Sequence, residues 1–266
     1  QDEYYAEDLL DSLSKFLIVE ISDTKFAFNI SNIKEIILLP KVTPIPESYD
    51  YERGIIKLRN NVMKVIDLRK KLNFTSLEDE DKEFLNMLMQ RKQDHINWLN
   101  ELIASVDENR TFNLTNDPTQ CAFGKWYYSY KSDNISMSIY LAQFDHPHRV
   151  IHEIADKVKE FVGKGDFNSA KKLIHDTKNN EFNLMINLFD NIHNILNETH
   201  REIGIVFENQ IDNDMICFSA DKVHSIAQID IDAVEHPNTI KNKNYIKGIA
   251  KQDNDVYIIL DEMKLF

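Results

Sequence analysis

The chain has 266 residues and a formal net charge of −13. This length allows a sizeable core in one or two domains, and the acidic balance argues against a nucleic-acid partner, because phosphate binding depends on clustered lysines and arginines. No apolar run approaches the ~18 residues that span a bilayer, so we expect no membrane insertion. Cys121 and Cys217 are the only cysteines, which excludes a disulfide scaffold and favours a reducing cytoplasm.

The first part of the chain carries strand signals. Residues 1–14 are acidic and weakly amphipathic, and we treat them as a separate N-terminal segment. The expected strands cover 16–21, 25–30, the end of 31–37 after a capped helical turn, 54–59 and 62–68, with turns at 22–24 and at Asn60 and Asn61. Five short strands by residue 68 predict a small barrel or sandwich over 15–76.

From Leu77 to about His200 the apolar period becomes helical. Apolar residues recur every three or four positions, for example at Leu88, Ile96, Leu99, Leu102, Ile151, Ile154, Val158, Leu188 and Ile192. Gly163 and Gly165 mark a break between the apolar stretch that ends at Val162 and the one that begins at Leu173. We expect an antiparallel helical bundle over 77–200, with nearly all of these apolar residues forming its core.

Strand signals return after His200. The expected strands cover 203–208, 214–219, 223–228, 245–250 and 256–260. A β pattern that a helical block interrupts and that then resumes over 201–266 predicts a helical domain inserted into a β domain. Insertions of this kind succeed at exposed loop tips.

Three histidines and one cysteine in the helical block are candidate metal ligands. His148 and His152 are four residues apart, so both imidazoles leave one face of a helix. Asp117 is a plausible N-cap and Pro118 a plausible first helical residue, which would place Cys121 in the first turn of a short helix. With His95, these residues make a complete tetrahedral set for zinc. Nine histidines are not rare in 266 residues, so a core or surface role stays open for each of them.

The segment 79–200 resembles the chemoreceptor zinc-binding domain, called CZB. The family has a Cys-x-Phe/Leu-Gly-x-Trp-Tyr motif, which residues 121–127 match without a mismatch, together with a histidine near a tryptophan and a His-x-x-x-His pair. The resemblance implies Zn²⁺ held by His95, Cys121, His148 and His152. His146 is not chosen, because it lies six residues from His152 and falls on a different helical face.

The CZB resemblance also implies a function for the insert. Proteins with this domain are linked to the sensing of zinc or of oxidants such as hypochlorous acid, and the domains tend to pair as homodimers. Cys121 is then the redox-sensing residue, because a zinc-bound cysteine is held as the oxidisable thiolate.

The outer parts of the chain resemble CheW, the coupling protein of bacterial chemotaxis arrays. The carrying blocks are 35–37, 44–46, 53–59, 65–68, 220–223, 245–250 and 258–261. The family's usual Asn-Leu-Arg-Gly is here Lys-Leu-Arg-Asn, without the glycine at position 60. The resemblance implies two five-stranded β-barrels that join the cytoplasmic tips of chemoreceptors to the histidine kinase CheA. Ile56, Leu58 and Arg59 would then lie on or near the receptor-facing surface.

The expected fold is therefore an α+β multidomain protein, a CheW-like double five-stranded β-barrel interrupted by an inserted antiparallel helical bundle. The expected function is a non-enzymatic chemotaxis adaptor with a zinc-binding sensory insert. A purely structural zinc is an alternative, since it needs the same four ligands. A zinc enzyme would need an open coordination position and a general base. Glu153 follows His152, but the His-Glu-x-x-His order of zincins is missing.

Overall fold

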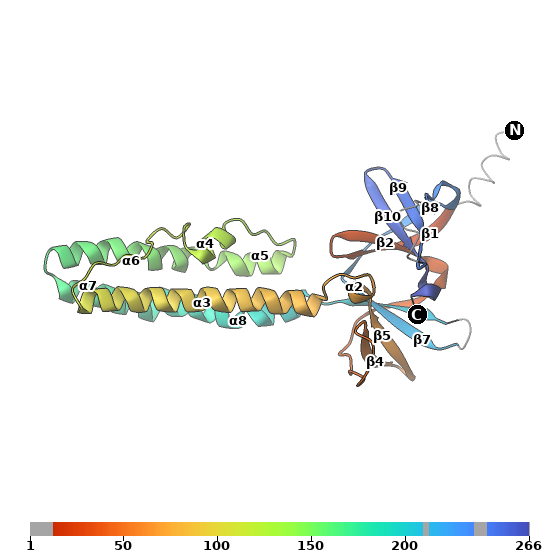
Figure 1. Cartoon of the computed structure of the whole chain (residues 1–266), viewed down its shortest axis with the longest axis horizontal. Helices are drawn as coiled ribbons and strands as arrows, with labels where there is room; N and C mark the ends of the chain where they lie inside the picture. Colours follow the sequence, from red (N-terminus) through yellow and green to blue (C-terminus); the bar gives the residue numbers. More distant parts are fainter. Residues whose placement is uncertain (1–12, 210–212, 237–243, 266) are drawn as a thin grey trace. The chain divides into compact units, whose positions relative to one another are not determined.

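The computed structural model describes residues 13–209, 213–236 and 244–265. The chain divides into two compact units, one of Gln1–Leu77 with His200–Phe266 and one of Glu78–Thr199, and each is considered by itself (Figure 1). The acidic segment expected at 1–14 lies outside the described residues, except for its last two, which begin the first strand. Within the described ranges, no helix is both long and apolar enough to cross a membrane.

The β unit contains two five-stranded sheets. Its strands are β1 (Leu13–Ile21), β2 (Thr24–Asn29), β3 (Ile33–Leu38), β4 (Glu52–Leu58), β5 (Asn61–Asp67), β6 (Ile203–Glu208), β7 (Met215–Ala220), β8 (Lys222–Asp230), β9 (Ile246–Gln252) and β10 (Asp255–Leu260). One sheet has the order β8-β1-β2-β10-β9 and the other the order β3-β6-β7-β5-β4. With the helical insert described below, these two sheets confirm the predicted fold class.

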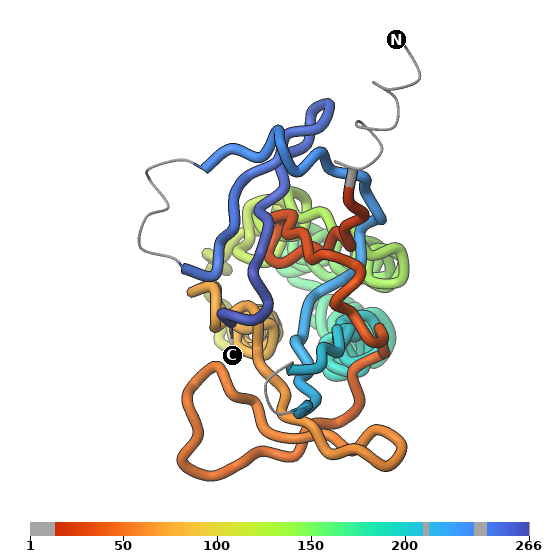
Figure 2. The backbone as a smooth tube through the Cα atoms, turned by 90° about the vertical axis from the view of Figure 1, so that its right-hand side faces the viewer, coloured from red at the N-terminus to blue at the C-terminus, as the bar shows by residue number. Residues whose placement is uncertain are grey.

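Each sheet takes strands from both sides of the helical unit. β10 pairs parallel with β2 in the first sheet, and β7 pairs parallel with β5 in the second. Figure 2 shows this interleaving, because red and blue segments from the two ends of the chain run through the same part of the molecule. Neither flanking segment can therefore complete a sheet without the other.

The two sheets share one apolar core. Phe28 of β2, Phe207 of β6 and Phe218 of β7 are at most 1% exposed. The rings of Phe28 and Phe207, which come from different sheets, lie 5.3 Å apart, and those of Phe207 and Phe218, on neighbouring strands of one sheet, lie 5.5 Å apart. Aromatic contacts between strands of different sheets fix how the sheets pack, because buried rings contribute a large apolar area and prefer tilted contacts.

The β4–β5 hairpin turns one residue earlier than predicted. Leu58 pairs with Asn61, so Arg59 and Asn60 form a two-residue loop, and Arg59 has a φ of 55°. The loop thus has only two residues even without a glycine, because Arg59 adopts the left-handed backbone conformation that glycine usually occupies. The expected strand 62–68 ends at Asp67, whose side chain accepts the Lys70 N–H and caps the short helix α2 (Leu68–Lys71).

The second unit is helical. It contains α3 (Leu77–Asp107), α4 (Ala122–Tyr127), α5 (Ile135–Ala142), α6 (Asp145–Gly163), α7 (Phe167–Thr177), the π-helical turn η2 (Lys178–Phe182) and α8 (Asn183–Thr199). A turn with Gly165 at a φ of 76° separates α6 from α7, and α7, η2 and α8 then follow without a break. The core is built from the apolar faces of these helices, including Leu88, Phe144, Met185 and Phe189.

Candidate metal centre

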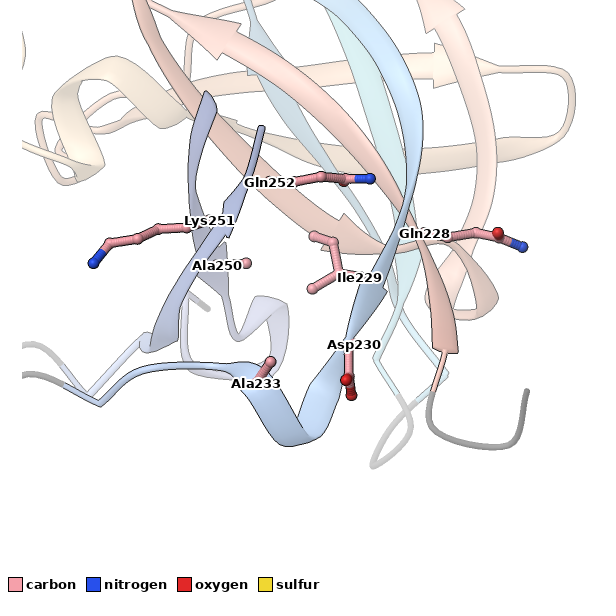
Figure 3. A pocket seen from close by; sticks show the side chains of 7 residues that line it. All are labelled: Gln228, Ile229, Asp230, Ala233, Ala250, Lys251 and Gln252. Carbon is pink, nitrogen blue, oxygen red and sulfur yellow. The ribbon is translucent and has the colours of Figure 1, made fainter. Parts of the chain in front are cut away.

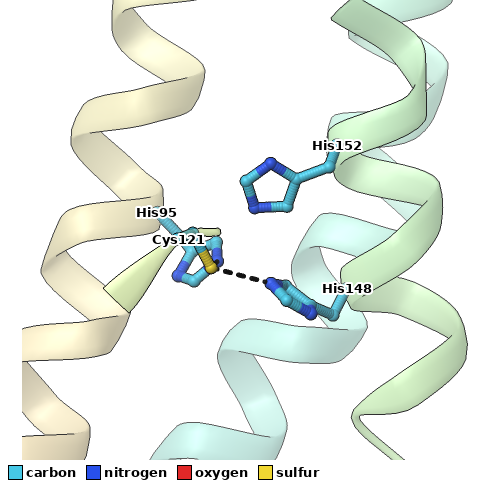
Figure 4. Close-up of side chains that lie close together, drawn as sticks. All are labelled: His95, Cys121, His148 and His152. Carbon is cyan, nitrogen blue, oxygen red and sulfur yellow. Dashed lines mark hydrogen bonds between the residues drawn. The ribbon is translucent and has the colours of Figure 1, made fainter. Parts of the chain in front are cut away.

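Three helices bring the four candidate ligands together. His95 comes from α3, His148 and His152 come from α6, and Cys121 precedes α4 (Figure 4). One ligand atom of each residue lies within 4.8 Å of all the others. The Cys121 Sγ is 3.2 Å from Nε2 of His148 and 4.0 Å from Nε2 of His95. A tetrahedral zinc with the usual bond lengths separates a sulfur from a nitrogen ligand by about 3.5 Å, so the cluster has the right size.

Cys121 is held by its position at the start of α4. It is the N-cap of this helix, and its Sγ accepts the backbone N–H of Gly124 at 3.1 Å. The expectation that Asp117 caps the helix and that Cys121 lies in its first turn is wrong. Asp117 instead accepts the Thr119 N–H at 2.8 Å and stabilises a turn that precedes the helix.

Gly124 makes this arrangement possible. A Cβ added at Gly124 would lie 1.8 Å from the backbone oxygen of Pro118, so no other residue fits without moving the loop that carries Cys121. The preceding Phe123 is 1% exposed, and its ring lies 4.9 Å from that of His148 and 5.8 Å from that of His95. The sequence motif around Cys121 therefore supplies a ligand, a close backbone approach and an apolar wall.

Backbone carbonyls orient two of the imidazoles. Nδ1 of His95 lies 2.7 Å from the oxygen of Arg91, and Nδ1 of His152 lies 3.3 Å from the oxygen of Thr115. Donation from Nδ1–H leaves the Nε2 lone pair free to bind a metal, which is the usual arrangement of metal-binding histidines. Sequence reasoning missed these two carbonyls, because a backbone atom has no residue-type signal.

Two buried ring nitrogens have no hydrogen-bond partner within the described part of the chain. They are Nδ1 of His148 and Nε2 of His152, and both side chains are fully buried. A buried polar atom without a partner destabilises a fold by about 1–3 kcal/mol. For Nε2 of His152, a metal ion at the centre of the cluster would supply the missing partner. The residues present therefore fit a bound cation.

The protonation states also suit a metal. Burial and the neighbouring imidazoles of His95 and His152 lower the pKa of His148 to about 2. Burial and the His95 imidazole lower the pKa of His152 to about 4, and burial also lowers the pKa of His95. All three rings are therefore neutral at neutral pH, which is the form that binds a cation. Burial raises the pKa of Cys121, so its ionisation calls for a bound cation.

The chemistry of the donor set favours zinc. Three neutral imidazoles and one thiolate fill a tetrahedral shell, which is typical of structural zinc sites and leaves no open position for a substrate. Among the residues that the structure describes, the cluster consists of these four side chains and includes no carboxylate that could serve as a general base. His146 is exposed on α6 and does not belong to the cluster.

The predicted partner-binding residues have different exposures. Ile56 is only 3% exposed and packs in the β-unit core beside Met63, Val65 and Cys217, so of the expected positions on or near the surface it can occupy only one beneath the surface. Leu58 is half-buried. The Arg59 side chain is 79% exposed, and its guanidinium lies 3.1 Å from the Glu35 carboxylate.

A hollow in the β unit offers no comparable chemistry. It has a volume of about 230 Å³ and is lined by Gln228, Ile229, Asp230, Ala233, Ala250, Lys251 and Gln252. Figure 3 shows Ile229 directed toward Ala250, while the Lys251 ammonium points outward. Asp230 accepts the Asp232 N–H, and Lys251 pairs with Glu235. The metal cluster is therefore the better candidate site.

Comparison with protein families gives two matches. The CheW-like domain matches residues 15–96 and 190–266, and the chemoreceptor zinc-binding domain matches residues 95–159. The first match covers strands on both sides of the helical unit. The second covers the region that contains all four candidate ligands.

Two curated relatives agree with the first match. The chemotaxis protein CheW of Thermotoga maritima is 32% identical over 79 residues, which are 29% of this chain and 52% of that protein. The chemotaxis protein CheW of Bacillus subtilis is 29% identical over 85 residues, which are 32% of this chain and 54% of that protein. This chain thus spans about half the length of the curated relatives that it matches. The scaffolding protein TtCheW of Thermoanaerobacter tengcongensis aligns over 96% of this chain and 88% of its own, with 15% identity and a TM-score of 0.46.

Proposed function

The chain belongs to the CheW-like family and carries an inserted chemoreceptor zinc-binding domain, and from this we propose a non-enzymatic chemotaxis adaptor that couples chemoreceptors to the histidine kinase CheA in the cytoplasm. The observation that carries the proposal is the pair of complete five-stranded sheets assembled from both flanks of the insert. A scaffold needs such a surface and no reaction centre. The relatives named CheW support the same role.

The β4–β5 hairpin is the proposed receptor contact. Arg59 projects from the hairpin loop with most of its side chain exposed, and Leu58 precedes it at the end of β4. The ion pair with Glu35 on β3 holds the guanidinium in place. Apolar side chains dominate the affinity of such interfaces, whereas charges set orientation and association rate.

A charge reversal tests this contact. Arg59→Glu should weaken receptor binding about tenfold, because the new carboxylate repels Glu35 and reverses the charge that the hairpin presents to the receptor. Lys251→Glu is a matched control, since Lys251 is also exposed and ion-paired but lies on β9 of the other sheet. Normal receptor binding by Arg59→Glu would remove this residue from the interface. CheA binding is measured in parallel in the same pull-down.

The helical unit is proposed as the input of the adaptor. His95, Cys121, His148 and His152 would hold one Zn²⁺, and the metal when bound would keep the Cys121 sulfur as a thiolate. The three imidazoles are at most 3% exposed, whereas Cys121 is half-buried. A small oxidant in solution therefore meets the sulfur ligand first.

Hypochlorous acid is a suitable oxidant for this step. The thiolate sulfur attacks the chlorine of hypochlorous acid and releases hydroxide, and water then displaces chloride to give sulfenic acid. The oxidised sulfur would be a weaker ligand, so a zinc ion bound by the four residues would be held less tightly and the loop before α4 would be free to rearrange. Alternatively, the site reports the zinc concentration itself.

A purely structural zinc is the second candidate. It is favoured by the way the cluster joins the start of α4 to α3 and α6 through three buried imidazoles and the half-buried Cys121. Graded hypochlorous acid separates the two candidates when Cys121 oxidation, zinc content and CheA activity are measured together. A sensor loses zinc and changes kinase activity when Cys121 is oxidised. A structural site keeps its zinc and leaves coupling unchanged.

The helical unit also offers a surface for a homodimer. Ile135 and Ile139 lie one turn apart on α5 and are 77% and 63% exposed. Isolated exposed apolar residues are common, but two in one row can form a contact between copies of the chain. Sedimentation of Ile135→Asp/Ile139→Asp tests this, because the proposed dimer should become monomeric. An unchanged dimer would place the contact elsewhere.

A further inference from the structure

The loop between α3 and α4 is attached to the core by Trp98. Trp98 lies three residues after His95 on α3 and is 5% exposed. Its indole Nε1–H donates to the backbone oxygen of Thr115 at 2.8 Å. The bond joins residues 17 positions apart, so it fixes the path of the loop that leads to Cys121.

The same Thr115 oxygen contacts the ligand His152. Nδ1 of His152 lies 3.3 Å from this oxygen, and the Trp98 and His152 ring centroids are 4.9 Å apart. A carbonyl oxygen has two lone pairs and can accept both donors. Donation from Nδ1–H leaves Nε2 of His152 as the free nitrogen, and this is the atom that faces the cluster without a partner.

The three imidazoles are supported in different ways. His95 donates to Arg91, one turn earlier on its own helix, so any intact α3 provides this bond. Nδ1 of His148 has no hydrogen-bond partner in the described ranges of the chain. Within the described residues, His152 alone of the three is oriented by a carbonyl from another element, and Trp98 holds that carbonyl in place.

We propose that Trp98 is a positioning residue for the zinc ligand His152, acting through the backbone carbonyl of Thr115. This inference rests on the proposed zinc site. Trp98, which lies near His95 in the sequence, then has a role beyond packing in the core. It also makes the orientation of one ligand depend on the loop that carries another.

The loop therefore has two attachments to the metal centre. Thr115 supports His152 through its carbonyl, and Cys121, six residues later, supplies the sulfur. The side chain of Asn116 donates to Asp156, which lies one turn after His152 on α6. Loss of the sulfur ligand would free one end of this loop and weaken the support of His152. Release of Cys121 and release of His152 are thus coupled.

Trp98→Phe tests the inference, because it removes the N–H donor and keeps an aromatic ring. We expect zinc affinity, measured with a competing chelator on the full chain, to fall about 10–100-fold, the usual effect of losing a hydrogen bond that orients a ligand. Tyr140→Phe is the matched control. It removes a hydroxyl that donates to the Leu188 carbonyl at 2.7 Å elsewhere in the helical unit, and this variant should stay within about twofold of the wild type.

A second measurement separates positioning from packing. Nitrogen-15 NMR of the histidine rings reports which nitrogen of His152 carries the proton. The wild type should show protonated Nδ1, whereas Trp98→Phe should show a mixture of tautomers. Phe112→Ala removes a ring that packs 5.1 Å from Trp98 but keeps the N–H donor, so it should lower stability without changing the tautomer.

The outcomes decide the inference independently of the zinc proposal. Wild-type zinc affinity and an unchanged His152 tautomer in Trp98→Phe would overturn the role of Trp98 and leave the zinc site standing. A wild-type chain without zinc would sink the zinc proposal. The metal-free histidine spectra would then still decide, because an identical His152 tautomer in wild type and Trp98→Phe overturns the positioning role.

Discussion

The two units differ in how completely their buried polar side chains are hydrogen-bonded. In the β unit, the nearly buried Arg69 donates Nε and one Nη to the two oxygens of Asp221, at 2.8 and 2.7 Å, and its other Nη to the Thr75 carbonyl. In the helical unit, two buried histidines each keep a ring nitrogen without a partner within the described ranges. The β-unit network is complete without a ligand, whereas a cluster of metal-ligating side chains with unpartnered buried nitrogens fits a bound cation.

The satisfied groups lie where the chain leaves and re-enters the β unit. Arg69 binds Thr75 shortly before α3 begins. Glu202, shortly after α8, pairs with Arg53, and its backbone oxygen accepts the Leu39 N–H at 3.0 Å. Burial raises the pKa of Glu202, with Arg53 acting in the opposite direction. One oxygen of Glu262 is the exception among the described β-unit residues, since it is buried without a partner.

Removal of zinc should have the largest effect and should act on one unit. Binding free energy at a structural zinc site is folding free energy, with values of about 10–16 kcal/mol in zinc-finger peptides. We expect a strong chelator to lower the Tm of the helical unit far more than that of the β unit. Calorimetry of the full chain with and without chelator measures both transitions. Equal shifts, or none, would break the contrast between the units.

Breaking the β-unit network should destabilise the β unit and leave the metal centre of the helical unit unchanged. Arg69→Ala leaves Asp221 without its buried partner and should lower the free energy of unfolding of the β unit by about 3 kcal/mol. Lys25→Ala is the control, because its partner Asp255 is 42% exposed and such pairs contribute at most about 1 kcal/mol. Denaturant unfolding measures both. Zinc content should be unchanged, and a loss of zinc in Arg69→Ala would contradict the separation.

The two thiols sharpen the comparison at the level of single atoms. Cys217 is fully buried in the β unit, and burial raises its pKa to about 12, so only about one molecule in 10,000 carries a thiolate at pH 8. After a chelator has removed the metal, Cys121 should react with an alkylating reagent faster than Cys217, because its thiol is half-buried and that of Cys217 is fully buried, and zinc should protect it. Peptide mass spectrometry gives both rates. Faster labelling of Cys217 would refute the assignment of Cys121 as the accessible thiol.

A pair of glycines tests the geometry of the centre with a smaller expected effect. Gly124→Ala forces the Pro118 backbone away from α4 and should lower zinc affinity about tenfold, since ligand displacement has effects of this order. Gly163→Ala is the control, because an added Cβ there meets no atom within 4 Å. Chelator competition on both variants provides the readout. Equal zinc affinities would show that the Cys121 loop tolerates the displacement.

The sequence could predict the candidate ligands because their signals are local. The helical spacing of His148 and His152 and the motif around Cys121 each lie within one segment, and the structure brings these residues together with His95. Their binding of zinc stays a prediction. The cap of α4 was misjudged because an aspartate followed by proline is typical of a turn as well as of a helix start.

Other features depend on contacts that no local pattern contains. The parallel pairs β2–β10 and β5–β7 join residues on opposite sides of the helical unit. Ile55 and Ile56 are adjacent isoleucines on β4, so alternation could not predict that Ile56 faces the core. The role of Arg59 as a loop residue at positive φ was missed because asparagine and glycine are more common there.

X-ray absorption at the zinc edge, combined with elemental analysis of the full chain, tests the central claim that the helical insert holds a zinc ion with one sulfur ligand. We expect one zinc per chain, with one sulfur at about 2.3 Å and three nitrogens at about 2.0 Å. Cys121→Ala should lose most of the metal, whereas His146→Ala and His175→Ala, which change exposed histidines, should retain it. A zinc shell without sulfur, or full zinc content in Cys121→Ala, would contradict the account.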